Sequence, residues 1–368
     1  MTPKPTLAVV GATGAAGSVM LQMLTHHADV WGEIRLVSSP RSAGLPQALG
    51  SARAGGTPLA AVRGEECEIL ALSEEVFDGV DLALFLVPED VAARWAPIAV
   101  SKGAVVVDTS AAFRADPDVP LVVPEINAHA ARVRPRGIVA GPGSTTLALI
   151  VAVGALHAEF GLAELVVTVQ QAASGAGAGQ AGVDALRAQL GLVASDGDLG
   201  THPGDVRRAV GDSTGPFPGP LALNVLPWSG APAADGSSTE EERVRDETRR
   251  VLGLSRLRIA ATCVRVPVVT GHSVSVHARF ENPVPVGRAH EVLATSPGVV
   301  LYDDPAAGDF PTPADVVGTD PAWVGRVRRS LDDERALDFF VCADNLRKGA
   351  ALNALQIAES LVTDLWDL

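Results

Sequence analysis

The pattern of hydrophobic and polar positions changes near residue 140. Before that point, short apolar runs alternate with helical patterns, and the first helical pattern extends to about residue 27. Strands that alternate with helices predict an α/β fold with a parallel, doubly wound sheet. The runs lie at Leu7–Val10, Ile34–Val37, Val80–Val87 and Ala104–Val107.

After residue 140 the expected strands are longer and alternate with a period of two. In Ser273–Phe280 the even positions are apolar or alanine and the odd positions are polar. This alternation is typical of an α+β domain whose largely antiparallel or mixed sheet is covered on one side. Similar runs lie at Leu165–Gln171 and Arg258–Val269. Residues 194–238 are rich in Gly, Pro, Asp and Ser and predict a loop, and residues 345–366 predict a final helix.

Composition narrows the class of protein. A formal net charge of −14 argues against nucleic acid or an anionic membrane as a general partner. The three cysteines are widely spaced, which indicates neither a disulfide framework nor a metal site and favours a reducing, cytoplasmic setting. A strand pattern begins too early for a signal peptide, and the longest apolar run, residues 147–156, is too short to cross a bilayer.

A glycine motif follows the first expected strand. Gly11, Gly14 and Gly17 lie between that strand and the first helix, where a backbone can approach a pyrophosphate and free N–H groups favour an anion. We expect a dinucleotide site that also includes Thr13, Ala15 and Ala16. The alternative is a tight strand–helix turn without a ligand.

The second expected strand predicts which dinucleotide binds. NAD-binding proteins usually carry an acidic residue at this point to accept the ribose hydroxyl. This chain has Ser38, Ser39, Arg41 and Ser42 there and no acid. The pattern favours NADP, with the arginine available to a 2′-phosphate, over a polar turn whose arginine is solvated.

Two charged or titratable residues stand out in the second half. Arg265 interrupts an apolar strand, where a guanidinium is costly unless it meets an anion such as a carboxylate. His272 falls on the apolar face of the next strand. Such a histidine is more often a hydrogen-bonded core residue than a catalytic acid or base, and both readings stay open on spacing alone.

Glu240, Arg243 and Glu247 share one face of a helix that Ser238 or Thr239 would cap. A solvated salt-bridge face is the default interpretation. Polar clusters at Arg114 and at Gln171 with Ser174 and Gly175 are equally ambiguous when they are considered singly.

Taken together, these motifs resemble the aspartate-β-semialdehyde dehydrogenase family over essentially the whole chain. Residues 141–146, Gly-Pro-Gly-Ser-Thr-Thr, stand where that family carries Asn-Pro-Asn-Cys-Thr-Thr. The other matching segments are residues 11–17, 41–44, 112–114, 122–125, 171–177, 262–272 and 344–350.

The resemblance implies a Rossmann-type NADP-binding domain, residues 1–140 with 345–368, and a substrate-binding and dimerisation domain, residues 141–344. It implies that a histidine shuttles protons (His272), a glutamine lies beside the acyl centre (Gln171) and an arginine holds the substrate carboxylate (Arg265). Contacts with the substrate amino group and phosphate are implied for Glu240, Arg114 and Arg243, and cofactor contacts for Ser174, Gly175 and Asn345.

The departures from the family pattern are concentrated around the nucleophile. Ser144 stands in place of the cysteine, and Gly141 and Gly143 stand in place of the two asparagines before it. Thr109 stands in place of a third asparagine of the family pattern. A serine hydroxyl has no thiolate-like anion population and needs an adjacent base.

We therefore expect a diverged, NADP-binding enzyme that acts on an aspartate-like small molecule without a thioester, with His272 as acid or base. The first alternative is a non-catalytic paralogue that binds nucleotide or associates with an active relative. Minor alternatives are acyl transfer or hydrolysis by Ser144 and His272, and residual activity of the family type. A homodimer is expected.

Overall fold

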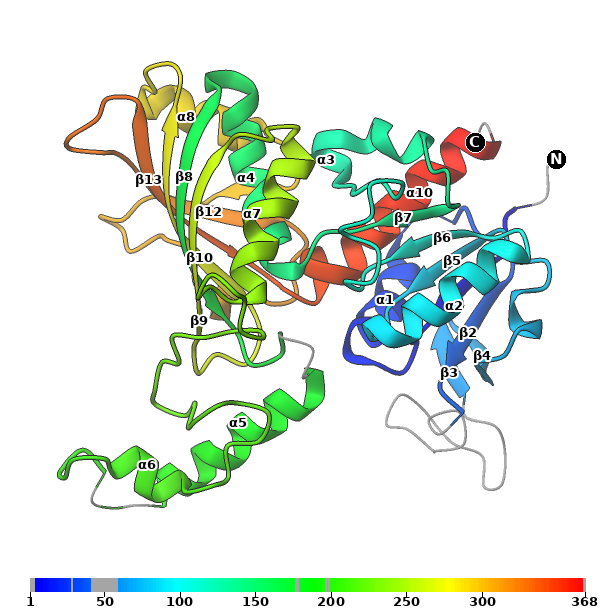
Figure 1. The fold of residues 1–368 in the computed structure, drawn as a ribbon, viewed down its shortest axis with the longest axis horizontal. Coiled ribbons are helices and arrows are strands. Elements are labelled where there is room, and N and C mark those ends of the chain that lie inside the picture. Colours follow the sequence, from blue (N-terminus) through cyan, green and yellow to red (C-terminus); the bar gives the residue numbers. More distant parts are fainter. Residues whose placement is uncertain are drawn as a thin grey trace. The chain divides into compact units, whose positions relative to one another are not determined.

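The computed structural model describes residues 4–27, 29–40, 59–175, 179–195, 197 and 199–366. The chain forms two compact units, one of Met1–Gly143 with Gly349–Leu368 and one of Ser144–Lys348. Figure 1 shows both in ribbon form, coloured along the sequence. The boundaries expected from the sequence, at residues 140 and 345, lie within a few residues of these.

The first unit is built on a sheet that has seven strands within the described residues, in the order β3-β4-β2-β1-β5-β6-β7. Its paired strands are parallel except β3 and β4. The strands are β1 (Leu7–Val10), β2 (Ile34–Ser38), β3 (Leu59–Val62), β4 (Glu65–Ala71), β5 (Leu82–Phe85), β6 (Val105–Asp108) and β7 (Ile138–Ala140). The predicted doubly wound sheet is confirmed, while the β3–β4 hairpin was not anticipated.

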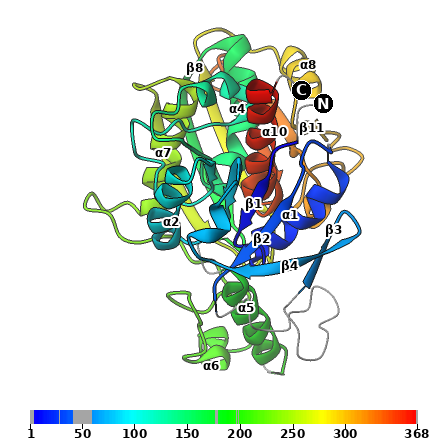
Figure 2. The same cartoon turned by 90° about the vertical axis from the view of Figure 1, so that its right-hand side faces the viewer.

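Every residue of β1 and β5 is buried, because helices cover both faces of this sheet. Helices α1 (Ala15–His26) and α10 (Leu352–Trp366) share one apolar core with the strands, and α2 (Glu89–Ser101) packs against β5 and β6. Figure 2 shows α1, α2 and α10 around β1. The short helices of this unit are η1 (Glu75–Phe77), α3 (Pro124–Asn127) and η2 (Ala128–Arg132).

The final helix begins later than the sequence predicts. Asp344 accepts backbone N–H bonds from Leu346 and Arg347, and this holds the chain in a turn. A π-helical turn, η3 (Arg347–Ala351), follows before α10 starts at Leu352. Asp344 thus makes the contacts of a helix N-cap, and the α-helix proper starts later than the periodic pattern predicts because the first turn after this cap is π-helical.

The second unit holds a mixed sheet, with six strands within the described residues in the order β11-β12-β13-β10-β8-β9. The pairs β8–β9 and β11–β12 are parallel and the others antiparallel, which confirms the predicted mixed sheet. The strands are β8 (Leu162–Gln171), β9 (Arg258–Arg265), β10 (His272–Phe280), β11 (Val299–Leu301), β12 (Ala322–Arg329) and β13 (Ala336–Ala343).

Strand β10 has the predicted apolar face, since Val274, Val276, Ala278 and Phe280 are all buried. One expected polar position differs. Ser273 is also buried, with its hydroxyl 3.2 Å from the Cys342 sulfur on the neighbouring strand. Strand β9 ends at Arg265 and not at residue 269, because the chain turns just before a proline, which cannot donate to a ladder.

Helix α4 (Ser144–Phe160) is apolar on nearly all sides and lies in the core of the second unit. It packs against β8, β10, β12 and β13 and against two further helices, α7 (Thr239–Leu252) and α8 (Val286–Thr295). The surrounding packing fixes the position of its N-terminal turn, which carries Ser144. The remaining short helix here is α9 (Pro313–Val316).

Residues 194–238 are not simply a loop, contrary to the sequence prediction. They contain α6 (Asp205–Val210), which packs with α5 (Gly179–Ala194). A small apolar core joins these helices through Leu186, Val210, Phe217 and Leu221. The Gly, Pro and Asp content that indicated a loop reflects the turns between these buried positions.

Candidate active site

The sheet of the second unit brings three predicted site residues together at the ends of adjacent strands. Gln171 at the end of β8 pairs with Arg265 at the end of β9. His272 opens β10, the strand on the other side of β8, and Ser273 pairs there with residue 170. Side chains at these ends therefore converge from three strands.

The hydrogen bonds of His272 define its tautomer. Its Nδ1 accepts the backbone N–H of Ala172 at 3.2 Å, so the proton of a neutral ring must lie on Nε2. That Nε2 lies 3.1 Å from Oγ of Ser144. Burial, together with the positive charge of Arg265, lowers the pKa of His272 to about 3. At neutral pH the ring is therefore uncharged and presents an N–H group to Ser144.

Gly175 makes room for this ring. A β-carbon at position 175 would lie 2.7 Å from Cε1 and 3.0 Å from Nε2 of His272, closer than real β-carbons approach. Its neighbour Ser174 is hydrogen-bonded to Asn345, and Asn345 Oδ1 accepts the backbone N–H of Gly271 at 2.8 Å. These three predicted cofactor contacts thus surround the turn that precedes His272.

Ser144 is the first residue of α4, and two threonines follow it. Thr145 and Thr146 donate to the carboxylates of Glu240 at 3.3 Å and Glu247 at 2.6 Å. Both acids come from α7, which begins with a capping box between Ser238 and residue 241. The predicted cap is present at Ser238.

The shared face of α7 is not the solvated salt-bridge face that the sequence favoured by default. Glu247 is only 4% exposed, and Glu240 is turned toward the strand ends. Arg243 donates to Oε1 of Glu240 at 2.7 Å while its own side chain stays partly exposed. Helical spacing correctly placed these residues on one face, but the burial came from α4, which packs against it.

The side chain of Gln171 is almost fully buried and engages three partners. Its Nε2 donates to Thr145 at 2.5 Å and to Oε2 of Glu240 at 3.1 Å, and its Oε1 accepts the hydroxyl of Ser229. Both protons of the amide are thereby used inside the protein. In this state the amide positions its neighbours and offers no spare donor.

Arg265 is 3% exposed, and its guanidinium lies among neutral oxygens. Nη1 donates to the Ala172 carbonyl and Nη2 to Ser229, each at 2.7 Å. Burial lowers the pKa of Arg265 to about 10, so the group is still a cation at neutral pH. Among the residues that the structure describes, no carboxylate forms an ion pair with it, which leaves a buried positive charge suited to an anionic ligand.

Ser229, Thr145 and Thr146 are site residues that the sequence analysis missed. Ser229 lies in the segment interpreted as a loop, and no spacing or periodicity singles it out. The threonines belong to residues 141–146, the segment in which Ser144 is the departure from the family pattern. One signal could have identified the threonines: they are two neighbouring hydroxyl residues in the first turn of a helix, and that turn faces two acidic residues.

The chain's three cysteines all lie within the described residues, and all are free. Cys263 is two residues before Arg265 on β9, but burial raises the pKa of its thiol far above the ordinary range. Burial also raises the pKa of Cys342, to about 11. Cys67 belongs to the other unit. Neither buried thiol of the second unit is ionised at neutral pH.

The first unit contains a cavity of about 530 Å³ at the predicted dinucleotide site. Gly11, Thr13, Gly14, Ser38 and Ser39 line it, and the hydroxyls of Thr13 and Ser38 lie 2.6 Å apart. Among the described lining residues there is no acidic side chain. Two further predicted contacts, Arg41 and Ser42, lie outside the described residues.

The glycines of this motif fit a phosphate-binding turn. Gly11 has a φ of 94°, and a β-carbon there would lie 2.4 Å from the Leu86 carbonyl oxygen. A β-carbon on Gly17 would lie 2.1 Å from the oxygen of Gly11, so Gly17 permits the tight turn without lining the cavity. The N-cap residue of α1 is Gly14, which has no side chain to cap the helix, so the first turn with Ala15 and Ala16 can offer its N–H groups to an anion.

Arg114 lies in the first unit, where its guanidinium donates to the carbonyl of Thr109. The Thr109 hydroxyl donates in turn to the Phe85 carbonyl at 2.9 Å. The structure thus links Arg114 to the position where the family pattern has an asparagine, and a contact with phosphate remains a prediction.

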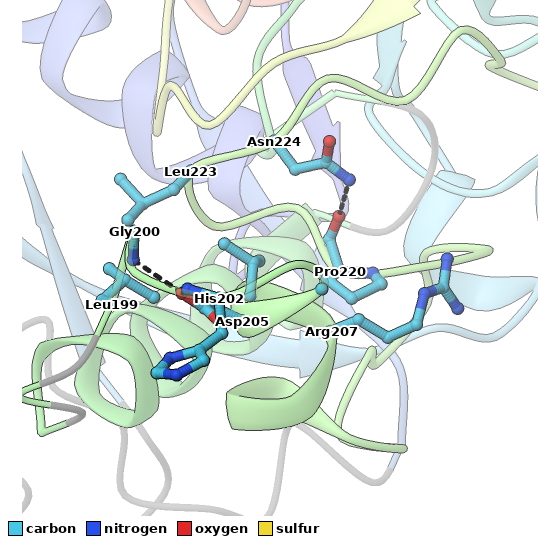
Figure 3. Close-up of a pocket in the computed structure, with 10 residues that line it drawn as sticks. Leu199, Gly200, His202, Asp205, Arg207, Pro220, Leu223 and Asn224 are labelled. Atoms are coloured by element: carbon cyan, nitrogen blue, oxygen red, sulfur yellow. Dashed lines mark hydrogen bonds between the residues drawn. The ribbon is translucent and has the colours of Figure 1, made fainter.

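A second cavity, of about 570 Å³, lies between α6 and the segment around Asn224 (Figure 3). None of the predicted site residues lines it. Asp205, the one acid among the described lining residues, already accepts the N–H groups of Gly200 and His202. This cavity therefore shares no lining residue with the cluster around His272.

Within the described residues, no group of three or more His, Cys, Asp or Glu side chains is arranged to hold a metal ion. The helices of the same part of the chain include none with the length and apolar character that a membrane span requires.

Comparison with known proteins agrees with this architecture. Residues 6–133 match the family model "Semialdehyde dehydrogenase, NAD binding domain", and residues 153–348 match "Semialdehyde dehydrogenase, dimerisation domain". The chain is 41% identical to an aspartate-semialdehyde dehydrogenase of Streptomyces akiyoshiensis, over 97% of this chain and 98% of the relative.

The chain belongs to the aspartate-semialdehyde dehydrogenase family.

Other members of the family are similarly close. The aspartate-semialdehyde dehydrogenase of Corynebacterium glutamicum is 40% identical over 97% of this chain and 99% of its own length. Among solved structures, aspartate semialdehyde dehydrogenase II from Vibrio cholerae, complexed with ASA, is 33% identical with a TM-score of 0.86. That match covers 99% of this chain and 100% of the Vibrio chain. The family consists of nicotinamide-dependent oxidoreductases of the aldehyde type, and this chain matches both its NAD-binding domain and its dimerisation domain.

Proposed function

We propose that this chain is an NADP-dependent oxidoreductase that reduces a carbonyl of an aspartate-like amino acid directly, without a covalent thioester. In this proposal Ser144 stands at the position where the family pattern has its cysteine nucleophile. The observation that carries it is the contact between Ser144 and a histidine that presents a proton and not a lone pair.

A neutral histidine that donates from Nε2 is suited to polarise a carbonyl oxygen. Enzymes elsewhere use a neutral imidazole in this way, where it stabilises negative charge that develops on oxygen. Because the pKa of His272 is about 3, the ring stays neutral at physiological pH. His272 would hold its Nε2 proton against the substrate oxygen, with the Ser144 hydroxyl next to it as a further polar contact. Once the carbonyl carbon has accepted a hydride, this oxygen would take up a proton to give the alcohol, and water would be the net source of that proton.

In this proposal two buried or partly buried residues of opposite charge recognise the substrate. Arg265, a buried cation that forms no ion pair with a carboxylate among the described residues, would bind the substrate carboxylate. Glu240, partly buried beside it, would accept the substrate ammonium group. Arg114 and Arg243 are proposed as further contacts for an anionic substituent. An α-amino acid with a carbonyl in its side chain matches this arrangement.

The first unit would bind the cofactor through Gly11, Gly14, Thr13 and the uncapped end of α1. A reduced nicotinamide, when bound, supplies the hydride that a carbonyl carbon accepts. The absence of an acid among the described lining residues, with Ser38 and Ser39 in its place, supports NADP over NAD. We also propose that the protein is a cytoplasmic homodimer, with which its free cysteines and dimerisation domain are consistent.

The distance between Ser144 and His272 also meets the requirement for a serine nucleophile with a histidine base. The polarity of the hydrogen bonds opposes that reading. A base must present an unprotonated nitrogen to the hydroxyl, and the N–H of Ala172 directs the lone pair of Nδ1 away from Ser144. Acyl transfer would therefore need the ring to change tautomer and lose this contact.

The test compares two variants in a steady-state assay of NADPH oxidation with aspartate-derived aldehydes, imines and esters. We expect turnover that Ser144→Ala leaves largely intact and that His272→Ala reduces by about 10²–10³-fold. Loss of turnover in Ser144→Ala would support the serine nucleophile instead. Binding of NADPH and L-aspartate without turnover of any compound would make the chain a non-catalytic paralogue.

A further inference from the structure

Ser229 joins two of the site residues whose chemistry the proposed function uses. Its side chain is 3% exposed, although it lies in a segment rich in Gly, Pro and Ser. The hydroxyl oxygen is 2.7 Å from Nη2 of Arg265, and the hydroxyl also contacts Oε1 of Gln171. No motif of the sequence assigns a role to this residue.

The direction of these hydrogen bonds is fixed by chemistry. A guanidinium can only donate, so Ser229 must accept from Arg265. Its own proton is then directed to Gln171, which must present the amide oxygen. The amide nitrogen of Gln171 consequently faces Thr145 and Glu240, to which it donates. A chain of bonds with a single polarity thus runs from the cation Arg265 to the anion Glu240.

Local structure explains why a serine so far along the chain reaches this point. Leu226 and Arg265 exchange both backbone hydrogen bonds, at 3.0 and 2.8 Å, which pins the segment to the end of β9. Gly230 has a φ of 89°, and a β-carbon there would lie 2.5 Å from the Thr239 hydroxyl. Ser229 is therefore held between an anchor on β9 and a close approach to the start of α7.

We propose that Ser229 is a positioning residue of the site, which orients the guanidinium of Arg265 for a ligand carboxylate and fixes the amide of Gln171. Two of the five N–H groups of Arg265 are held by Ser229 and the Ala172 carbonyl, and three remain for a ligand. The geometry of those three depends on the plane that the two internal acceptors define. This inference rests on the proposed function for the ligand, and on geometry alone for the orientation of Gln171.

The test uses the full-length protein with Ser229→Ala, Ser229→Thr and, as matched control, Ser213→Ala in the same segment, where the serine is exposed. Titration calorimetry with L-aspartate in the presence of NADPH measures the ligand contact. We expect Ser229→Ala to weaken binding by about tenfold, the loss of one charge-assisted hydrogen bond at the guanidinium. Ser229→Thr, which keeps the hydroxyl, should restore most of the affinity.

A second measurement needs neither ligand nor activity. The side-chain amide resonances of Gln171, assigned in ¹⁵N-labelled protein with Gln171→Glu, report the bonds of Nε2 and Oε1. They should shift in Ser229→Ala and remain near their original positions in Ser229→Thr and Ser213→Ala. Unchanged resonances in Ser229→Ala would overturn the inference. If they shift while the unaltered protein binds no L-aspartate, the proposed function fails and the positioning of Gln171 stands.

Discussion

The hydroxyl of Ser144 and Nε2 of His272 lie 3.1 Å apart, and the proton between the two atoms belongs to the histidine in its neutral form. The Ala172 N–H, which bonds the opposite nitrogen, imposes this arrangement. A ring held in this way donates to Ser144, and a negative charge at position 144 would meet a neutral partner.

A cysteine at position 144 should therefore behave as a single titrating thiol. In Ser144→Cys, the neutral ring of His272 cannot form the thiolate–imidazolium pair that keeps some enzyme thiols reactive in acid. We expect the alkylation rate of residue 144 by iodoacetamide, followed by mass spectrometry, to fall steadily as pH decreases below about 8. An alkylation rate that stays constant down to pH 5 would show that His272 is charged, and this would contradict the assigned tautomer.

Restoring more of the family pattern should be harder than this single change. A β-carbon at Gly141 would lie 3.2 Å from the amide nitrogen of Asn353, a buried side chain that also bonds the Val122 carbonyl. Ser144→Cys combined with Gly141→Asn and Gly143→Asn tests whether family activity can be recovered. A lower unfolding midpoint than that of Ser144→Cys alone is the expected side effect, because Asn353 must shift.

Acid should destabilise the fold through His272. Its pKa is depressed from 6.5 to about 3 in the folded protein, so the unfolded chain binds the proton first as pH falls. The stability associated with the neutral ring is present above pH 6.5 and is lost toward pH 3, at about 1.4 kcal/mol per pH unit. His272→Gln should remove this part of the slope in urea denaturation between pH 5 and 7.

An exposed histidine provides the control for that measurement. His129→Gln changes a side chain on the surface of the first unit and should leave the pH slope as it is in the unaltered protein. Equal slopes in His272→Gln and the unaltered protein would mean that His272 titrates normally, and the burial argument would then be wrong.

Gly175→Ala should displace the ring of His272, and the effect on stability can be measured without a substrate or an activity assay. The added β-carbon would lie 2.7 Å from Cε1 of His272, on a ring that is fully buried. We expect a loss of about 1–3 kcal/mol in the free energy of unfolding, as for other overpacked positions. Gly191→Ala in α5, where the new methyl group meets open space, should be neutral or stabilising by up to about 1 kcal/mol.

The hydroxyl of Thr146 should contribute to stability and not to ligand binding. It donates to Glu247 at 2.6 Å in a buried setting between α4 and α7. Thr146→Val keeps the shape and removes this bond to a charged acceptor, which should cost about 1.5–3 kcal/mol in urea denaturation. Thr295→Val, an exposed position in α8, should change stability by less than about 0.5 kcal/mol. If Thr146→Val and Thr295→Val change the free energy of unfolding by the same amount, the buried hydrogen bond does not contribute more than an exposed one.

The sequence predicted the parts of the fold that depend on local periodicity. The strand at residues 7–10 and the alternating face of β10 were found from apolar spacing, and the turn after the first strand was found from its three glycines. The start of α10 was misplaced because a π-helical turn at Arg347–Ala351 precedes it, which periodicity does not reveal. The helix within residues 194–238 was missed because it is only six residues long, lies between Gly204 and Gly211, and is too short to show a helical repeat of apolar residues.

The candidate site divides in the same way. Gln171, Arg265 and His272 could be singled out because polar residues in apolar strands are conspicuous, and strand register then brings them together. Ser229 could not, since its position depends on a backbone bridge between residues far apart in the chain. The burial of Glu247 likewise depends on α4, which lies about a hundred residues away in the sequence.

The first turn of α4 has a wider consequence. Ser144, Thr145 and Thr146 are consecutive, and each hydroxyl contacts a different residue: His272, Glu240 and Glu247. A displacement of this helix along its axis by even one residue would break all three contacts at once. Attempts to redesign the chain for a new substrate will therefore succeed more readily on the surrounding segments than on this turn.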